Sequence, residues 1–109
     1  MIVPRAPENL RKDTRRWWRS IVREWALEEH HRRLLTLMAE SWDRIVEARE
    51  RIEADGAYIE DRFHQLKAHP ALAVERQEKI AFARLLRELD LDVEPPPEPR
   101  RPAKLRRYD

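Results

Sequence analysis

Apolar residues recur at helical spacing in three stretches of this chain, and segments with polar residues, Pro or Gly separate the stretches. Apolar side chains three and four positions apart share one face of an α-helix, where they can be buried together. The first stretch begins near Asp13 or Thr14, and either side-chain oxygen can cap the start of a helix. Its apolar face is formed by Trp17, Trp18, Ile21, Val22 and Trp25. This pattern predicts a first helix with an aromatic face that packs on a core.

The second stretch predicts a longer helix over residues 30–54, after a short connection at residues 26–29. Its apolar stripe is formed by Leu34, Leu35, Met38, Trp42, Ile45, Val46 and Ile52. Arg49 interrupts this stripe. The long side chain of Arg49 either reaches water near the helix end or forms an ion pair across a contact between subunits. Gly56, the one glycine of the chain, is expected to end the helix in a left-handed conformation.

Two short runs of β-favouring residues follow Gly56, at residues 57–60 and 62–66. They predict a small β-hairpin. A two-stranded hairpin is not stable by itself in water, so this one has to pack on the helices or on a neighbouring subunit.

The third stretch predicts a helix from about Pro70 to Leu89, because proline is tolerated in the first turn of a helix but not deeper. Its broad apolar face holds Ala71, Leu72, Val74, Phe82, Leu85, Leu86 and Leu89. Glu75 and Glu78 fall within that face, and Ile80 points away from it. An apolar face that is divided in this way favours contact of the helix with more than one neighbouring element or subunit. Irregular burial within a monomer explains the pattern nearly as well. We take Trp42, Tyr58, Phe63 and Ile80 as candidate contacts, either in the core or between subunits.

Together these stretches predict a mainly α fold with three helices, a short β-hairpin between the second and third helix, and a disordered or extended Pro-rich basic tail. Residues 1–12 hold two prolines and no apolar periodicity, and they are expected to form a flexible N-terminal arm. Residues 13–92 are expected to form the helical core and oligomerisation domain. Five prolines in residues 93–102 break any helix, so residues 93–109 are assigned to the tail.

Composition supports a helical protein with a modest core. A chain of 109 residues forms at most one domain, and a charged fraction of 40% with one glycine favours long helices with solvated outer faces. Four tryptophans argue against overall disorder, and the lack of cysteine excludes disulfides and thiol chemistry. The sequence shows neither a membrane span nor the apolar core of a signal peptide, so a soluble, intracellular protein without a membrane contact is expected.

Charge is distributed unevenly along the chain, although the net charge is only +2. Residues 1–33 hold nine Lys and Arg against five Asp and Glu, residues 34–90 hold nine against twelve, and residues 91–109 hold five against four. Basic ends that flank an acidic middle suggest a nucleic-acid contact at one or both ends, although such ends also bind acidic proteins and RNA.

A basic stripe follows the first predicted helix on the face opposite the tryptophans. The basic stripe is formed by Lys12, Arg15, Arg16, Arg19 and Arg23. Guanidinium groups on a helix that is anchored by aromatic side chains can bind DNA phosphates; alternatively, the stripe is a solvated face partnered by Glu24 and Glu28. A second group of cations lies in the tail and either binds DNA, docks on an acidic partner protein or keeps the protein soluble. This group is Arg100, Arg101, Lys104, Arg106 and Arg107.

No enzyme template is complete in this sequence. A single glycine excludes a Gly-rich phosphate loop. The pairs His30-His31 and His64/His69 have no carboxylate at a recognised metal-ligand spacing, so we expect no metal and no cofactor. A hydroxyl group needs a neighbouring base to act as a nucleophile, and no such base is evident for Ser20, Thr36 or Ser41. We therefore expect no catalytic residue and no enzymatic activity.

The order and spacing of these elements, over roughly residues 14–92, resemble those of the phage terminase small-subunit family. The resemblance is carried by a helix with Trp and Ile/Val, a longer helix that ends in Ala54-Asp55-Gly56, a short extended segment, Lys67, His69-Pro70-Ala71-Leu72, and a helix that closes in Leu85-Leu86-Arg87-Glu88-Leu89. Family members often carry Gly near His64, Pro at Ala68 and Gly at Asp90, and they tend to end in a small Ser/Arg-rich tail. The chain departs at these points, and its Pro-rich basic tail leaves the partner of that tail open.

The resemblance implies a non-catalytic protein that forms a cyclic homo-oligomer. It implies binding of double-stranded viral DNA at the packaging start site, and regulation of the large terminase subunit, which carries the ATPase and the nuclease. The expected location is the host cell cytoplasm. Two other classes remain open: a small helical dimeric DNA-binding regulator, against which the lack of a clear helix-turn-helix counts, and an assembly adaptor that makes no DNA contact.

Overall fold

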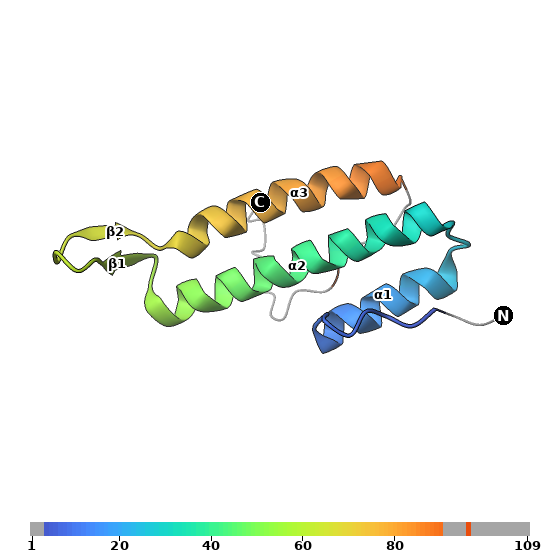
Figure 1. Ribbon diagram of the computed structural model, residues 1–109, viewed down its shortest axis with the longest axis horizontal. Helices are drawn as coiled ribbons and strands as arrows, with labels where there is room; N and C mark the ends of the chain where they lie inside the picture. The colour runs from blue at the N-terminus through green and yellow to red at the C-terminus, as the bar shows by residue number, and fades with distance from the viewer. Residues whose placement is uncertain (1–3, 91–95, 97–109) are drawn as a thin grey trace, which may run out of the picture.

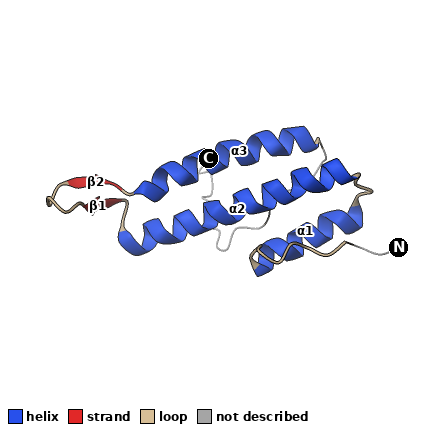
Figure 2. Cartoon of the chain, in the orientation of Figure 1, coloured by secondary structure: helices blue, strands red, loops and turns tan. Residues whose placement is uncertain are grey.

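The computed structural model describes residues 4–90 and residue 96, and within them the chain forms three helices and one β-hairpin (Figure 1). Helix α1 spans Lys12–Glu24, α2 spans Glu29–Asp55 and α3 spans Pro70–Leu89. Strands β1, Tyr58–Glu60, and β2, Leu66–Ala68, form a hairpin that projects beyond the shared end of α2 and α3 (Figure 2). The predicted mainly α fold is confirmed. The predicted tail, apart from Pro96, lies outside the described residues.

Helix α2 is the central element of the fold. Helix α3 runs antiparallel to it along most of its length, whereas α1 lies along the N-terminal half of α2 on the other side in this view (Figure 1). All three helices contribute to one core: Trp17, Trp18 and Ile21 from α1, Leu35, Met38, Ala39 and Ile45 from α2, and Phe82 and Leu89 from α3. The ring of Trp42 packs against this core, with its centroid 5.5 Å from that of Phe82. Burying each large apolar side chain contributes roughly 1.5–3 kcal/mol.

Helix α1 is capped by α2 and not by its own side chains. The expectation that Asp13 or Thr14 caps the helix is wrong, because the residue that precedes α1 is Arg11 and it has no side-chain cap. Instead, Asp43 of α2 accepts a hydrogen bond from the backbone N–H of Arg11 at 2.8 Å and another from the hydroxyl of Thr14. A carboxylate from another helix thus satisfies a free N–H group at the helix start. Leu10, in the segment expected to be a flexible arm, is buried in the core; the proposed domain boundaries stay a prediction.

The polar residues that interrupt the apolar faces of α2 and α3 pair with each other. Nε of Arg49 lies 2.8 Å from Oε2 of Glu75, so Arg49 makes an ion pair within the chain, which neither of its two sequence interpretations foresaw. This contact is held by charge, since Oε2 accepts no hydrogen bond of good geometry within the described residues. The buried hydroxyl of Ser41 lies 2.7 Å from Oε2 of Glu78 and 3.0 Å from its backbone oxygen. Each glutamate on the α3 face therefore has a partner on α2.

The hairpin turn is longer than the sequence pattern predicted. The expected second strand at residues 62–66 is wrong, because residues 61–65 form the turn and β2 begins only at Leu66. The carboxylate of Asp61 accepts hydrogen bonds from the N–H groups of Phe63, at 2.8 Å, and Gln65, at 3.1 Å, which holds this segment in a turn. The strands are antiparallel, with Tyr58 opposite Ala68 and Glu60 opposite Leu66.

Three residues in the described part of the chain have positive φ: Gly56 at 86°, His64 at 61° and Asp90 at 50°. Gly56 ends α2, as its sequence position predicted, and its N–H donates to the carbonyl of Ile52. His64 and Asp90 thus adopt a conformation that glycine favours, and His and Asp are among the residues that tolerate it best.

His69 joins the end of α2 to the start of α3. Its Nδ1 accepts a hydrogen bond from the N–H of Ala71 at 3.0 Å, which caps α3, and its Nε2 lies 2.8 Å from Oδ2 of Asp55. Because Nδ1 is an acceptor here, the proton of the neutral ring lies on Nε2 and is donated to Asp55. One side chain thus fixes the two ends between which the hairpin is inserted.

Candidate nucleic-acid interface

The basic stripe lies on the solvent side of α1. Lys12, Arg16 and Arg23 are exposed, and Arg15 and Arg19 are partly exposed. The opposite side of the helix is buried through Thr14, Trp17, Trp18 and Ile21. Among residues 4–90, none of the five basic side chains forms an ion pair or a side-chain hydrogen bond, so neither Glu24 nor Glu28 neutralises them there. The stripe therefore presents five unneutralised cations along one helix face.

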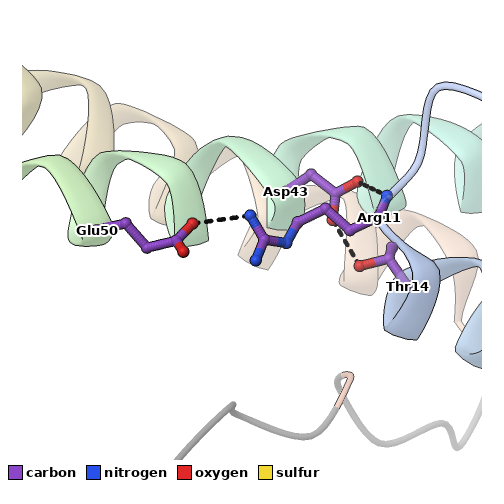
Figure 3. Close-up of polar contacts among 4 residues, drawn as sticks. All are labelled: Arg11, Thr14, Asp43 and Glu50. Carbon is purple, nitrogen blue, oxygen red and sulfur yellow. Dashed lines mark hydrogen bonds and ion pairs between the residues drawn. The ribbon is translucent and has the colours of Figure 1, made fainter.

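The start of α1 is anchored to α2 by a polar clasp, formed by Arg11, Thr14, Asp43 and Glu50 (Figure 3). Figure 3 shows the Arg11 side chain reaching along α2, where its Nη1 lies 2.7 Å from Oε1 of Glu50. Just before the clasp, Nδ2 of Asn9 donates to Oε2 of Glu40 at 3.1 Å. Glu40, Asp43 and Glu50 of α2 thus hold Arg11 and the chain around it. In the described part of the chain, none of these three carboxylates pairs with a cation of the basic stripe.

A second basic feature was not foreseen from the sequence. Arg5 before α1 and Arg32 and Arg33 at the start of α2 line one open groove, together with Trp18 and residues of the N-terminal segment. We call it the arginine groove. The adjacent pair Arg32-Arg33 was visible in the sequence, but only the path of residues 4–7 across the helices brings Arg5 to it.

The candidate contact residues separate into one that is packed and three that are exposed. Trp42 is partly buried against the core, whereas Tyr58, Phe63 and Ile80 are exposed. Leu66, which was not among the candidates, is 73% exposed, beside Tyr58 at 70% and Phe63 at 68%. The projecting hairpin therefore carries three large apolar side chains in water. The five cations of the tail lie outside the described residues.

Three side chains at the start of α2 approach one another closely enough to share a cation. In the described part of the chain, the potential ligand atoms of Glu28, His30 and His31 lie within 4.8 Å of one another. The carboxylate of Glu28 was missed as a partner for the histidine pair in the sequence. The side chains of Glu28 and His30 are mostly exposed, and the first turn of a helix disfavours a cation because its free N–H groups carry partial positive charge. This arrangement does not assign a metal.

The hydroxyl groups have structural partners in the fold. Ser20 donates to the backbone oxygen of Trp17 at 2.6 Å, and Thr36 accepts from the indole N–H of Trp18 at 3.1 Å. The carboxylate of Glu78 lies beside Ser41, but Ser41 is buried between α2 and α3, where no substrate can reach it. No helix in the described residues is long and apolar enough to cross a membrane.

The fold and its surface define a small helical protein whose first helix presents an unneutralised basic face. Comparison with protein-family models matches residues 14–95 to the family described as phage terminase, small subunit, which covers most of the chain. The chain therefore belongs to the phage terminase small-subunit family. Membership confirms the resemblance seen in the sequence. No curated protein and no solved structure matches the chain.

Membership gives the general role. The family works in phage DNA packaging with the large terminase, in the cytoplasm of the infected host cell, and is generally non-catalytic.

Proposed function

We propose that this chain forms a ring that binds double-stranded viral DNA at the packaging start site through the basic stripe of α1, and that it regulates the large terminase subunit. The observation that carries the DNA contact is the division of α1 into a buried aromatic face and a face of five unneutralised cations. The aromatic face fixes the helix on the core, so the guanidinium groups are held toward solvent. Phosphate contacts of this kind position a protein on DNA without reading its sequence.

A ring would multiply this weak contact. Each subunit offers only a few cations, but linked copies that bind one duplex together gain affinity through their effective concentration. Each neutralised phosphate also releases counterions, so binding is expected to weaken as salt rises. Selection of one site would then come from the cost of bending DNA as well as from base contacts.

The hairpin supports the assembly part of the proposal. In the observed register, Tyr58 and Leu66 lie on the same face of the two-stranded sheet, and Phe63 lies in the adjoining turn. An exposed apolar group on a projecting hairpin is typical of a surface that meets another protein. A hairpin of this size also gains stability from such a contact. We take a second copy of the chain as the neighbour, and Ile80 of α3 as a further contact.

DNA binding is tested by reversing the charge of the stripe. We expect a gel-shift complex with duplex DNA to vanish when Arg15, Arg16, Arg19 and Arg23 are changed to Glu, and to survive deletion of residues 95–109. A matched control changes Arg44, Arg51, Arg84 and Arg87 to Glu, which alters net charge equally on exposed faces of α2 and α3. Equal loss in both variants would reject the stripe as the contact. Loss on deletion of the tail alone would assign the DNA contact to the tail, and a wild-type protein that forms no complex with DNA would favour the adaptor instead.

Assembly is tested by measuring the native mass of the particle. The ring predicts a closed assembly of more than two subunits, and the double variant Tyr58→Ser/Leu66→Ser is expected to reduce its mass while helix content by circular dichroism stays unchanged. A particle of two subunits would favour the dimeric regulator. Regulation is tested separately: the wild-type protein should change the ATPase rate of the large subunit, and a monomer without this effect would overturn the proposal.

A further inference from the structure

Three arginines gather around the arginine groove, which lies beside the N-terminal half of α2 and has a volume of about 650 Å³. Arg5 comes from the segment before α1, and Arg32 and Arg33 come from the first turns of α2. One wall is formed by Trp18 and by prolines of the N-terminal segment. The groove thus combines an apolar wall with guanidinium groups from two separate parts of the chain.

The charges in the groove are not balanced. Nη2 of Arg33 lies 3.0 Å from Oε1 of Glu29, and both side chains are largely exposed. Arg5 and Arg32 form no ion pair within residues 4–90. One acidic residue therefore faces three cations, which leaves an excess of positive charge for an anionic ligand.

The Trp18 wall of the groove is held in place by the core. Trp18 is 3% exposed, and its indole N–H donates to the hydroxyl of Thr36 at 3.1 Å, so its ring is held by the core and by α2. Arg5 lies between Pro4 and Pro7, whose rings restrict the backbone of this segment. An anion that binds here needs to order mainly the arginine side chains.

We propose that the arginine groove binds a backbone phosphate of the same duplex DNA that the basic stripe contacts; this rests on the proposed function. Guanidinium groups match phosphate oxygens with paired hydrogen bonds, which favours this ligand class. The groove and the stripe also adjoin. Arg15, at the edge of the stripe, precedes the groove-lining Trp18 by three positions on α1, so this edge adjoins the groove although the Trp18 ring itself is buried. A DNA backbone that reaches the Arg15 edge of the stripe would lie beside the groove.

The test compares two pairs of neutral substitutions in the full-length protein. The groove variant is Arg5→Gln/Arg32→Gln, and the matched control is Arg44→Gln/Arg51→Gln on the exposed outer face of α2. Binding of a fluorescent duplex is measured by anisotropy over a series of KCl concentrations. Each lost phosphate contact lowers the slope of log K against log salt by about 0.9, so the groove variant is expected to lose about one unit for each subunit that engages the DNA. The control is expected to keep the wild-type slope.

The outcomes separate this proposal from the proposed function. Wild-type binding with an unchanged slope in the groove variant would overturn the groove while leaving the stripe intact. Equal loss in the groove variant and the control would also overturn it, since net charge alone would then explain the effect. Loss of large-subunit binding with DNA binding intact would assign the groove to an acidic protein segment instead. A wild-type protein that binds no duplex would reject both proposals.

A second measurement needs no variant. Phenylglyoxal modifies accessible arginines, and mass spectrometry locates the modified residues. We expect DNA to protect Arg5 and Arg32 from modification and to leave Arg44 and Arg51 reactive. Reactivity of Arg5 and Arg32 that is unchanged by saturating DNA would contradict the proposal.

Discussion

Helices α1 and α3 both pack on α2, but they are held in different ways. Helix α3 lies along most of α2, and the polar residues within that interface, Arg49 with Glu75 and Ser41 with Glu78, are paired across it. Helix α1 lies along part of α2 only and is fixed by a compact aromatic face and the polar clasp at its start. The antiparallel pair of helices α2 and α3 is therefore the scaffold. The position of α1 depends on a few residues.

The largest effect is expected from removing the aromatic contact of α1. Trp18 is almost fully buried, so Trp18→Ala should lower the free energy of unfolding by about 3–5 kcal/mol, through lost burial and the cavity left behind. Denaturant unfolding followed by circular dichroism measures this. Trp25→Ala is the control, because Trp25 is only partly buried at the end of α1 and should cost less. Equal costs would show that α1 is not anchored mainly by its buried face.

A smaller effect is expected in the polar clasp. Asp43→Ala removes the acceptor of both the Arg11 N–H and the Thr14 hydroxyl, and Thr14 is 2% exposed, so about 1–3 kcal/mol should be lost. The exposed Glu47 serves as the control for loss of an acidic residue on α2. A double-mutant cycle with Thr14→Val should give a coupling of about 0.5–3 kcal/mol, whereas additive effects would mean that the hydroxyl contact contributes nothing.

The smallest effect is expected at the ion pair between α2 and α3. Arg49 is about half exposed and Glu75 is 13% exposed, so solvent screening limits the cost of Arg49→Met to about 0.5–1 kcal/mol. The double variant Arg49→Met/Glu75→Leu should recover most of this loss, because it also removes the partly buried carboxylate, which then keeps only the longer contact to Lys79 at 3.9 Å. Unfolding measurements on both variants decide this. A double variant less stable than Arg49→Met would show that the pair itself stabilises the scaffold.

The local pattern of the chain was enough to predict the helices. Gly56 and Pro70 mark where α2 ends and α3 begins, and the apolar spacing between such signals is regular enough to identify each helix. The buried face of α1 and the exposed side of the basic stripe followed from the same spacing. These features depend on residues within one or two helical turns of each other.

The features that were predicted wrongly or not at all depend on contacts between residues distant in sequence, or on a turn whose residues also have a high β propensity. Thr14 does not cap α1, because Asp43 from another helix takes that role. The strand expected at residues 62–66 was displaced by the hydrogen bonds of Asp61, which favour a turn over the β propensity of Phe63. Arg49 and Glu75 each looked like an isolated exception until α2 and α3 came together. The arginine groove needed the three-dimensional path of the N-terminal segment.

Helix α2 also has a mechanical consequence. It runs for 27 residues, about 40 Å, without an internal proline or glycine. Helix α1 lies beside its first half, and the β-hairpin lies at its far end (Figure 1). Because an uninterrupted helix resists bending, a force applied at the β-hairpin is expected to move α1 together with α2 and not to bend α2 between them.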